Sequence, residues 1–514
     1  MKKTILYTFI TLLLFIDSSL AQQLKPCGTV SGRSKWLKQY QANPDRFNKG
    51  ADTILYVPMT IHLLGTNGGN GHFRMPNFLD AFCRLNADFA ETNIHFYIND
   101  EINYINNSDW YQHDDIPTGA AMMFENNVEN TLNVYFVDDP AGACGYNLPY
   151  AGIANRKSCS GPDDHTWAHE VGHALSLPHP FLGWEGGVSH DGSVSHNFNN
   201  PAPREVYYDY TLFQQDQLYV DTLIIDTALV ELIDGSNCYE AADGFCDTEP
   251  DYLAARWGCD AEGRSPRIQT DPDGQKFDSD ASLIMSYAAD ECSRRFTPEQ
   301  IAAMRANLLN QKAAWLKDQT PLGAVSTDPI IINSPFQEEI TAAENIYFEW
   351  EAVENATHYI LQVSRLSSFV FNEVDVVVEG TDFEVESLRA DRKYYWRIRP
   401  YNNYSACTNF SETYDFQTSS SVTSTKAINT DLGLMIYPNL IQKGTSIQVH
   451  SYVSSIQPFT FSIYDLNGRL LKQEKWQLHR GDNTLPFDFQ ESGIYLLEIK
   501  SGEGIQIEKI VVQE

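Results

Sequence analysis

Long apolar runs alternate with amphipathic stretches over the first 320 residues. Residues 54–64 (ILYVPMTIHLL) and 133–137 (NVYFV) are almost entirely apolar, as in strands that are buried on both faces of a sheet. Apolar side chains recur at helical spacing in residues 76–90 and 298–315, and residues 94–98 have the pattern of another strand. This alternation predicts an α+β domain that is built on a mixed sheet.

After residue 320 the pattern changes to short runs of β-branched and aromatic residues. Trp350, Tyr359 and residues 394–401 (YYWRIRPY) have the spacing of a β-sandwich. Short strands return near the C-terminus, where Asn467-Gly468 predicts a tight hairpin. We therefore expect an α+β domain followed by two all-β sandwich domains. The predicted boundaries are 51–318 for the α+β domain, 325–418 for the first sandwich, 419–430 for a Ser/Thr-rich linker and 431–514 for the second sandwich.

The N-terminus has the features of an export signal. Lys2 and Lys3 precede an apolar stretch at residues 5–16, and Ser19 and Ala21 offer small side chains at the positions that a signal peptidase reads. We predict a signal peptide over residues 1–21 and a pro-segment over residues 22–50; the alternative is a buried first helix. After residue 20 no run of eighteen apolar residues occurs, so no helix is predicted to span a membrane.

The charge balance excludes one class of partner. Asp and Glu number 68 against 36 Lys and Arg, which gives a formal net charge of −32. Neutralising a phosphate backbone requires clustered Lys and Arg, so binding of nucleic acid is excluded.

Residues 163–180 (DDHTWAHEVGHALSLPHP) carry the clearest chemistry. His169 and His173 lie four residues apart and share one face of a helix, where two imidazoles can hold one Zn²⁺ ion. Glu170 is placed to take a proton from a water molecule at that ion. His179 follows Pro178, which ends the helix and turns the chain back toward the metal.

Three other histidines are weighed against this ligand set. His165 shares the helix face, but three side chains along one straight helix span roughly 11 Å and cannot converge on one ion. We therefore expect His165 to start the helix. We expect His190 and His196, in a polar loop, to lie outside the metal site.

The motif HExxHxxSxxH resembles the zinc signature of the metzincin proteases, with Ser176 where the family has Gly. Residues 282–287 (SLIMSY) resemble the family's Met-turn. Further likeness points to the pappalysin type (cytophagalysin-like): residues 183–185 (GWE), residues 246–248 (CDT) and Cys292. The likeness covers roughly residues 27–316.

The resemblance implies a secreted zinc endopeptidase that acts on proteins or peptides. It implies that His169, His173 and His179 bind zinc, that Glu170 is the general base and that Tyr287 stabilises the oxyanion. Two alternatives stay open. One is a surface-binding or adhesion protein with an inactive protease-like domain, and the other is a gluzincin-type site in which Glu185 replaces His179 as the third ligand.

Nine cysteines leave at least one unpaired. Cys27 precedes Gly28, and this pair resembles the cysteine switch of pappalysin-like zymogens, in which the thiolate takes the open position on zinc. We expect Cys27 to lie outside the folded domain and processing to fall near Arg46 or Lys49; a bridge to Cys83 is the alternative. The predicted disulfides are Cys259–Cys292, Cys238–Cys246 and Cys144–Cys159.

Two C-terminal segments resemble known modules. Residues 327–417 resemble a fibronectin type III module. Residues 437–439 (YPN), 463–465 (IYD) and 492–495 (SGIY) resemble the sorting domain of the type IX secretion system, although Leu440 replaces a second Pro. The likeness implies contact with that machinery and delivery to the cell surface or the medium.

Finally, three features near the centre predict ligand contacts. Strand-like residues 150–154 suit edge addition of an extended peptide. Asp290, after the Met-turn, predicts preference for Arg or Lys after the cleaved bond, with Glu291 facing solvent. Carboxylates near these loops could bind a structural Ca²⁺ ion, although the spacing is not that of an EF-hand. They belong to Asp247, Asp271, Asp273, Asp278 and Asp280.

Overall fold

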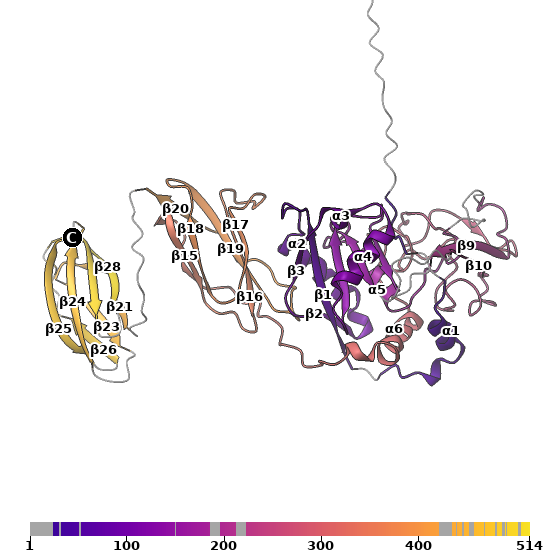
Figure 1. Ribbon diagram of the computed structural model, residues 1–514, viewed down its shortest axis with the longest axis horizontal. Coiled ribbons are helices and arrows are strands. Elements are labelled where there is room, and N and C mark those ends of the chain that lie inside the picture. Colours follow the sequence, from indigo (N-terminus) through magenta and orange to yellow (C-terminus); the bar gives the residue numbers. More distant parts are fainter. Residues whose placement is uncertain are drawn as a thin grey trace, which may run out of the picture. The chain divides into compact units, whose positions relative to one another are not determined.

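The computed structural model describes most of residues 24–513 (Figure 1). The gaps are residues 30–31, 51–52, 150, 186–195, 212–222, 421–433, 438, 445–446, 452–456, 467, 479–480, 486–488, 490 and 502–504. The predicted signal peptide, His190 and most of the predicted linker lie outside the described residues. Among the described residues no helix is long and apolar enough to cross a membrane.

A mixed sheet forms the centre of the N-terminal half, as predicted. Its strands are β1 (Leu55–Gly65), β2 (Ile94–Ile98), β3 (Asn103–Asn106), β5 (Leu132–Val137), β7 (Gly145–Leu148) and β8 (Gly152–Arg156). The order is β2-β1-β5-β8-β7, and β3 also pairs with β1. All pairs are parallel except that of β7 with β8, so an antiparallel strand lies at one edge.

The long helices cover both faces of this sheet. They are α1 (Lys35–Ala42), α2 (Met75–Asp88), α4 (Ile116–Asn126), α5 (Thr166–Ala174) and α6 (Pro298–Asn310). One core joins α2, α5 and α6 to the β5 side chains Val134 and Phe136, and a second core joins α4 to Tyr135 and Val137. The uninterrupted apolar run of β5 follows from this burial on both faces.

Shorter elements complete this region. They are α3 (Ser108–Tyr111), β4 (Gln112–His113), β6 (Asp139–Pro140), β9 (Glu205–Thr211), β10 (Leu223–Leu229), β11 (Gln269–Thr270) and β12 (Lys276–Phe277). Strands β9 and β10 pair antiparallel, as do β11 and β12. The long stretch between α5 and α6 is therefore mostly irregular chain, which is where the disulfides Cys238–Cys246 and Cys259–Cys292 lie.

The remaining elements are strands. Those from residue 332 to 419 contribute to a three-stranded and a five-stranded sheet. They are β13 (Ile332–Ser334), β14 (Glu339–Ala342), β15 (Glu344–Trp350), β16 (His358–Ser364), β17 (Val374–Val378), β18 (Asp382–Ser387), β19 (Lys393–Tyr401) and β20 (Tyr414–Ser419).

The last eight strands enclose one hydrophobic core between sheets of order β21-β23-β26 and β22-β28-β27-β24-β25. They are β21 (Leu434–Tyr437), β22 (Leu440–Gln442), β23 (Ile447–Ser451), β24 (Gln457–Asp465), β25 (Leu470–Leu478), β26 (Gly481–Leu485), β27 (Gly493–Lys500) and β28 (Ile505–Gln513). The all-β character predicted for the C-terminal part is confirmed.

The chain divides into two compact units. The first comprises the described residues up to Asn333 with Glu349–Asp382 and Tyr395–Tyr414, and the second comprises Ser334–Phe348, Phe383–Tyr394 and Asp415 onward. Within the first unit a disulfide joins Cys83 of α2 to Cys407, 324 residues away. The domain boundaries proposed from the sequence differ from this division and stay a prediction.

Candidate metal centre

Helix α5 places the first two histidines. Trp167 and Val171 on its inner face are buried against the sheet, and His169, Glu170 and His173 are buried on its other side. His165 is the residue that caps the helix, as expected, and its Nδ1 lies 2.9 Å from an Asp88 carboxylate oxygen at the end of α2. The helix is thus anchored at its start as well as along its buried face.

A left-handed turn brings the third histidine back. The helix ends at Ala174, and Ser176 has φ +77°, in the region that favours glycine. Leu177 N–H donates to the Gly172 carbonyl, and Asn307 Nδ2 of α6 donates to Ser176 Oγ at 3.0 Å. Ser176 therefore makes the turn that the sequence pattern required.

Three imidazole nitrogens meet at one point. The Nε2 atoms of His169, His173 and His179 lie 3.0–3.2 Å from one another. Tetrahedral Zn²⁺ with Zn–N distances near 2.05 Å would hold its nitrogens about 3.3 Å apart. Cys27 Sγ lies 3.6 Å from His173 Nε2, and the four ligand atoms lie within 4.8 Å of one another. A Zn–S distance near 2.3 Å requires about 3.6 Å between sulfur and nitrogen.

The far side of each ring determines its tautomer. His169 Nδ1 donates to the Ile284 carbonyl at 2.7 Å and His173 Nδ1 to the Leu177 carbonyl at 2.8 Å. His179 Nδ1 faces Glu185 Oε1 at 3.0 Å. Because these oxygens only accept hydrogen bonds, the protons sit on Nδ1 and the three Nε2 lone pairs face one another. Lone pairs this close repel unless a cation lies between them, so the residues present fit Zn²⁺.

Burial favours the neutral form that ligation requires. Burial, followed by the repulsion that a protonated His179 would exert, lowers the pKa of His169 to about 3 and that of His173 well below its usual value. Glu185 lies behind His179 and also accepts from the Gly183 N–H at 2.7 Å. Glu185 therefore contacts Nδ1 of His179, on the opposite side of the ring from the Nε2 atom that faces the other ligands.

Glu170 is fully buried beside the ligands. Thr29 Oγ1 donates to its Oε2 at 3.1 Å, whereas its Oε1 has no hydrogen-bond partner among the described residues. Burial raises the pKa of Glu170 to about 8. One carboxylate oxygen is therefore held by Thr29, in the predicted pro-segment, and the other lies near Gly145 of β7 without a donor among the described residues.

Residues 282–287, which resemble a Met-turn, pack against the helix that carries the first two histidines. Met285 is fully buried, and a Cβ atom added to Gly172 of α5 would meet its sulfur. Asp251 fixes the turn by accepting from Ser286 Oγ at 2.9 Å. Tyr287 lies beside His179, with 5.0 Å between ring centroids, and its hydroxyl donates to the Cys27 carbonyl at 3.2 Å.

The chain around Cys27, in the predicted pro-segment, lies against the histidine centre and not outside the folded domain, which corrects that expectation. Cys27 is only 4% exposed and packs among Phe181, Trp184 and Tyr287. The chain around it runs along the sheet edge: Lys25 pairs parallel with Ala143, and Gly28 N–H donates to the Gly145 carbonyl at 2.8 Å. An edge strand has backbone N–H and C=O groups without a neighbouring strand, and these groups bind the chain around Cys27.

This placement also corrects the predicted edge strand. Residues 152–156 form β8, which is paired on both sides, and the outermost strand of the sheet is β7 (Gly145–Leu148). The two strands form a hairpin, so the sequence pattern alone could not tell which was outer.

The three predicted disulfides are present, namely Cys144–Cys159, Cys238–Cys246 and Cys259–Cys292. The alternative bridge of Cys27 to Cys83 is wrong, because Cys83 pairs with Cys407 and Cys27 is a free thiol. Burial and the nearby Glu170 raise the pKa of Cys27 well above its usual value. Only a cation at the centre would favour its thiolate.

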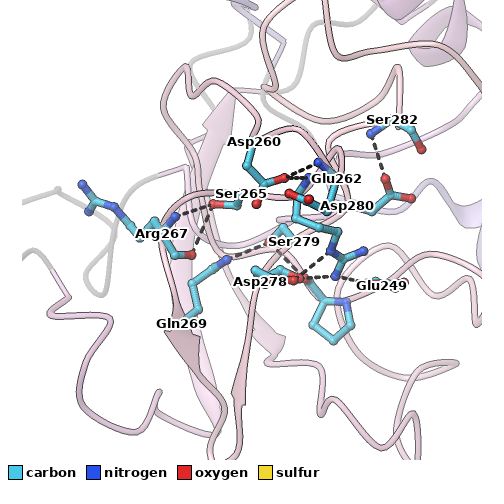
Figure 2. A network of polar contacts seen from close by, with 12 residues as sticks. Glu249, Asp260, Glu262, Ser265, Arg267, Gln269, Asp278, Ser279, Asp280 and Ser282 are labelled. Atoms are coloured by element: carbon cyan, nitrogen blue, oxygen red, sulfur yellow. Dashed lines mark hydrogen bonds and ion pairs between the residues drawn. The ribbon is translucent and has the colours of Figure 1, made fainter.

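Among the described residues, the five carboxylates proposed for Ca²⁺ do not gather into one cluster of ligand atoms, and a Ca²⁺ site stays a prediction. Asp278 binds Arg264 at 2.8 Å, Asp280 binds Arg295 at 2.7 Å and Asp273 binds Arg204 at 2.5 Å. Figure 2 shows Asp278 and Asp280 within this polar network. Asp271 accepts N–H groups of its own turn, and Asp247 accepts from the Glu299 N–H of α6.

Asp290 lines a pocket next to the centre, as predicted, and Glu291 is exposed. The Asp290 carboxylate is already bound by Arg256 and by the His165 N–H at 3.1 Å.

His196 lies outside the group of metal-ligand atoms and packs against Trp184 and Phe198. Sequence reasoning missed Thr29 and Arg256, because neither belongs to a motif.

Comparisons with known proteins bear mainly on the C-terminus. The family described as "Secretion system C-terminal sorting domain" matches residues 435–513. No curated protein matches the chain. The chain therefore carries a type IX sorting domain, which directs secretion or attachment to the cell surface through that system.

Among solved structures, a mutant of promirolysin from Tannerella forsythia is similar at 16% identity, over 57% of this chain and 96% of that one, with a TM-score of 0.33. Chicken CNTN1 FN1–FN3 domains are similar at 11% identity, over 37% and 69%, with a TM-score of 0.17. The sixth domain of human fibronectin type III domain containing protein 3 is similar at 18% identity, over 21% and 99%, with a TM-score of 0.16. TM-scores of this size do not establish a shared fold.

Proposed function

We propose that the chain is the latent form of a secreted zinc endopeptidase of the metzincin class, pappalysin type. One observation carries the proposal: three Nε2 lone pairs converge within 3.2 Å, with each ring fixed from behind, next to a buried glutamate. His169, His173 and His179 would hold the ion, and Cys27 would supply a fourth ligand in the latent form.

When bound, Zn²⁺ polarises the scissile carbonyl and lowers the pKa of a water molecule. Glu170 Oε1, which lacks a donor among the described residues, would accept the proton of the attacking water and later deliver it to the leaving amine. Tyr287 would donate its hydroxyl proton to the carbonyl oxygen on which negative charge develops. The edge strand β7 offers backbone groups to an extended peptide.

The pro-segment contacts the histidines, Tyr287 and the second oxygen of Glu170, Oε2, in the present structure. Cys27 Sγ faces the histidines, the Cys27 carbonyl holds the Tyr287 hydroxyl, and Thr29 holds Glu170. The pro-segment also lies along the strand that would bind substrate. Latency therefore has several separable parts, and processing between Cys27 and β1 would release all of them.

The preference for Arg or Lys after the cleaved bond stays a prediction. Asp290 lies in the pocket beside the centre, where a carboxylate would attract a guanidinium or an ammonium group. The carboxylate of Asp290 is already paired with the guanidinium of Arg256.

The decisive test compares processed wild type with Glu170→Gln, which keeps the size of the side chain. We expect about one zinc per chain in both proteins and casein hydrolysis by the wild type alone, reduced in the variant by about 10³-fold or more. Zinc in both proteins with no hydrolysis by either would instead favour an inactive surface-binding protein.

A further inference from the structure

A small pocket opens beside the metal centre. Its walls come from the start of α5 at His165 and Thr166, from the chain after the Met-turn as far as Asp290, and from Arg256. Pro26 of the pro-segment also lines it, so little free volume remains, about 20 Å³. Removal of the pro-segment would leave this pocket open to a substrate side chain.

The two charged walls are held together by the backbone. Trp257 N–H donates to the Tyr287 carbonyl at 3.2 Å, and Ala289 N–H donates to the Trp257 carbonyl at 2.7 Å. The Cys259–Cys292 disulfide joins the same two segments a few residues further on. Arg256 and Asp290 thus face each other because their backbones are paired, unlike two surface side chains that meet by chance.

Both oxygens of the Asp290 carboxylate are in use. Oδ1 accepts the His165 N–H at 3.1 Å, and Oδ2 binds the Arg256 guanidinium. The two side chains are only partly exposed, 23% for Asp290 and 34% for Arg256, so water screens their interaction less than on an open surface.

We propose that Arg256 is a specificity-determining residue that competes with a basic substrate side chain for Asp290. The proposal rests on the proposed peptidase function and deepens it. A substrate guanidinium must share the carboxylate with Arg256 and come close to a like charge, so Arg256 weakens the basic preference that Asp290 alone would give. The charges of Arg256 and Asp290 offset each other within the pocket lining.

The test uses the processed full chain and two peptides that differ only after the cleaved bond, one with arginine and one with citrulline. Citrulline has the shape of arginine without its charge, so the ratio of kcat/KM values measures charge recognition alone. This ratio does not depend on the fraction of folded enzyme. Arg256→Gln is the principal variant because it retains most of the side-chain volume, and Arg256→Ala supports it.

We expect both variants to raise the arginine-to-citrulline ratio by about ten- to hundred-fold, the worth of a charge-assisted hydrogen bond. Asp290→Asn should lower the ratio below the wild-type value, and Arg256→Gln with Asp290→Asn should bring it near unity. Arg204→Gln is the matched control, because it breaks an exposed Arg–Asp pair that does not line the pocket, and it should leave the ratio unchanged.

A ratio within about twofold of wild type in both Arg256 variants would overturn the proposal, and so would a lower ratio. Failure of the proposed function has a different signature: neither peptide nor casein is cut by the wild type, and Glu170→Gln makes no difference.

Discussion

Two regions of the first compact unit are rich in side chains of the kinds that bind metals, and only in one of them do the ligand atoms of several side chains converge. The histidine centre consists of His169, His173, His179 and Cys27, whose ligand atoms lie within 4.8 Å of one another. The acidic segment, residues 271–280, contains four aspartates, and each one is bound to an arginine or to backbone N–H groups.

The histidine centre and the acidic segment differ in which atoms of each side chain are already bound by other groups of the chain. An imidazole has two nitrogens, so a carbonyl or carboxylate behind the ring can fix one while the other faces the centre. A carboxylate next to arginines has its charge neutralised within the chain, as Asp278 has at Arg264. Ligand-type residues form a metal site where their inner atoms are left without donors, and clustering in the sequence is not sufficient.

The largest expected effect concerns zinc content. His169→Ala, His173→Ala or His179→Ala should reduce bound zinc from about one per chain to below about 0.1, because three-histidine coordination is lost. Asp271→Asn and Asp278→Asn should retain about one zinc per chain. Elemental analysis after gel filtration measures both sets. If the aspartate variants lost zinc and the histidine variants kept it, the acidic segment and not the histidine centre would be the zinc site.

The second prediction concerns latency. Unprocessed Cys27→Ala should hydrolyse casein, whereas unprocessed Thr29→Val should stay latent because Cys27 still faces the histidines. In the double variant the activity should rise about fivefold above Cys27→Ala, since a hydrogen bond to Glu170 worth about 1 kcal/mol is removed.

Processed wild-type enzyme serves as the reference for full activity in that assay. A Cys27→Ala precursor as inactive as the wild-type precursor would show that the thiol does not maintain latency.

The third prediction concerns the residue behind the ligand. Glu185→Gln should weaken zinc binding about 10- to 100-fold without abolishing it, because Glu185 orients His179 and does not face the centre. Competition with a chelator of known affinity measures the shift. If zinc is lost on Glu185→Gln and kept on His179→Ala, the acidic residue is the ligand and the gluzincin alternative holds.

The smallest effect is expected in the acidic segment. Asp278→Asn removes a partly exposed ion pair with Arg264, whose side chain is 28% exposed, and should cost less than about 1 kcal/mol of stability. Thermal unfolding of the metal-loaded protein measures this change. A loss above about 3 kcal/mol, or one that added Ca²⁺ reverses, would mean that these carboxylates do hold an ion.

Local pattern was sufficient for much of this protein. The strands at residues 94–98 and 133–137 and the helices α2 and α6 follow from periodicity. The left-handed turn at Ser176 was implied by the resemblance to the zinc signature, and the three predicted disulfides are also present. The convergence of His169, His173 and His179 was predictable from their spacing. They lie within eleven residues, so one helix and one turn set their geometry.

Contacts between distant segments depended on the tertiary fold. Thr29 meets Glu170 across 141 residues, Arg256 meets Asp290 across 34, and Cys83 pairs with Cys407 across 324. A pattern of period 2 or 3.6 records which face of an element is apolar, not which remote side chain will pack against it. The order of strands decides that β7 is the outer strand, and only this order brings the chain around Cys27 next to the three histidines and Glu170.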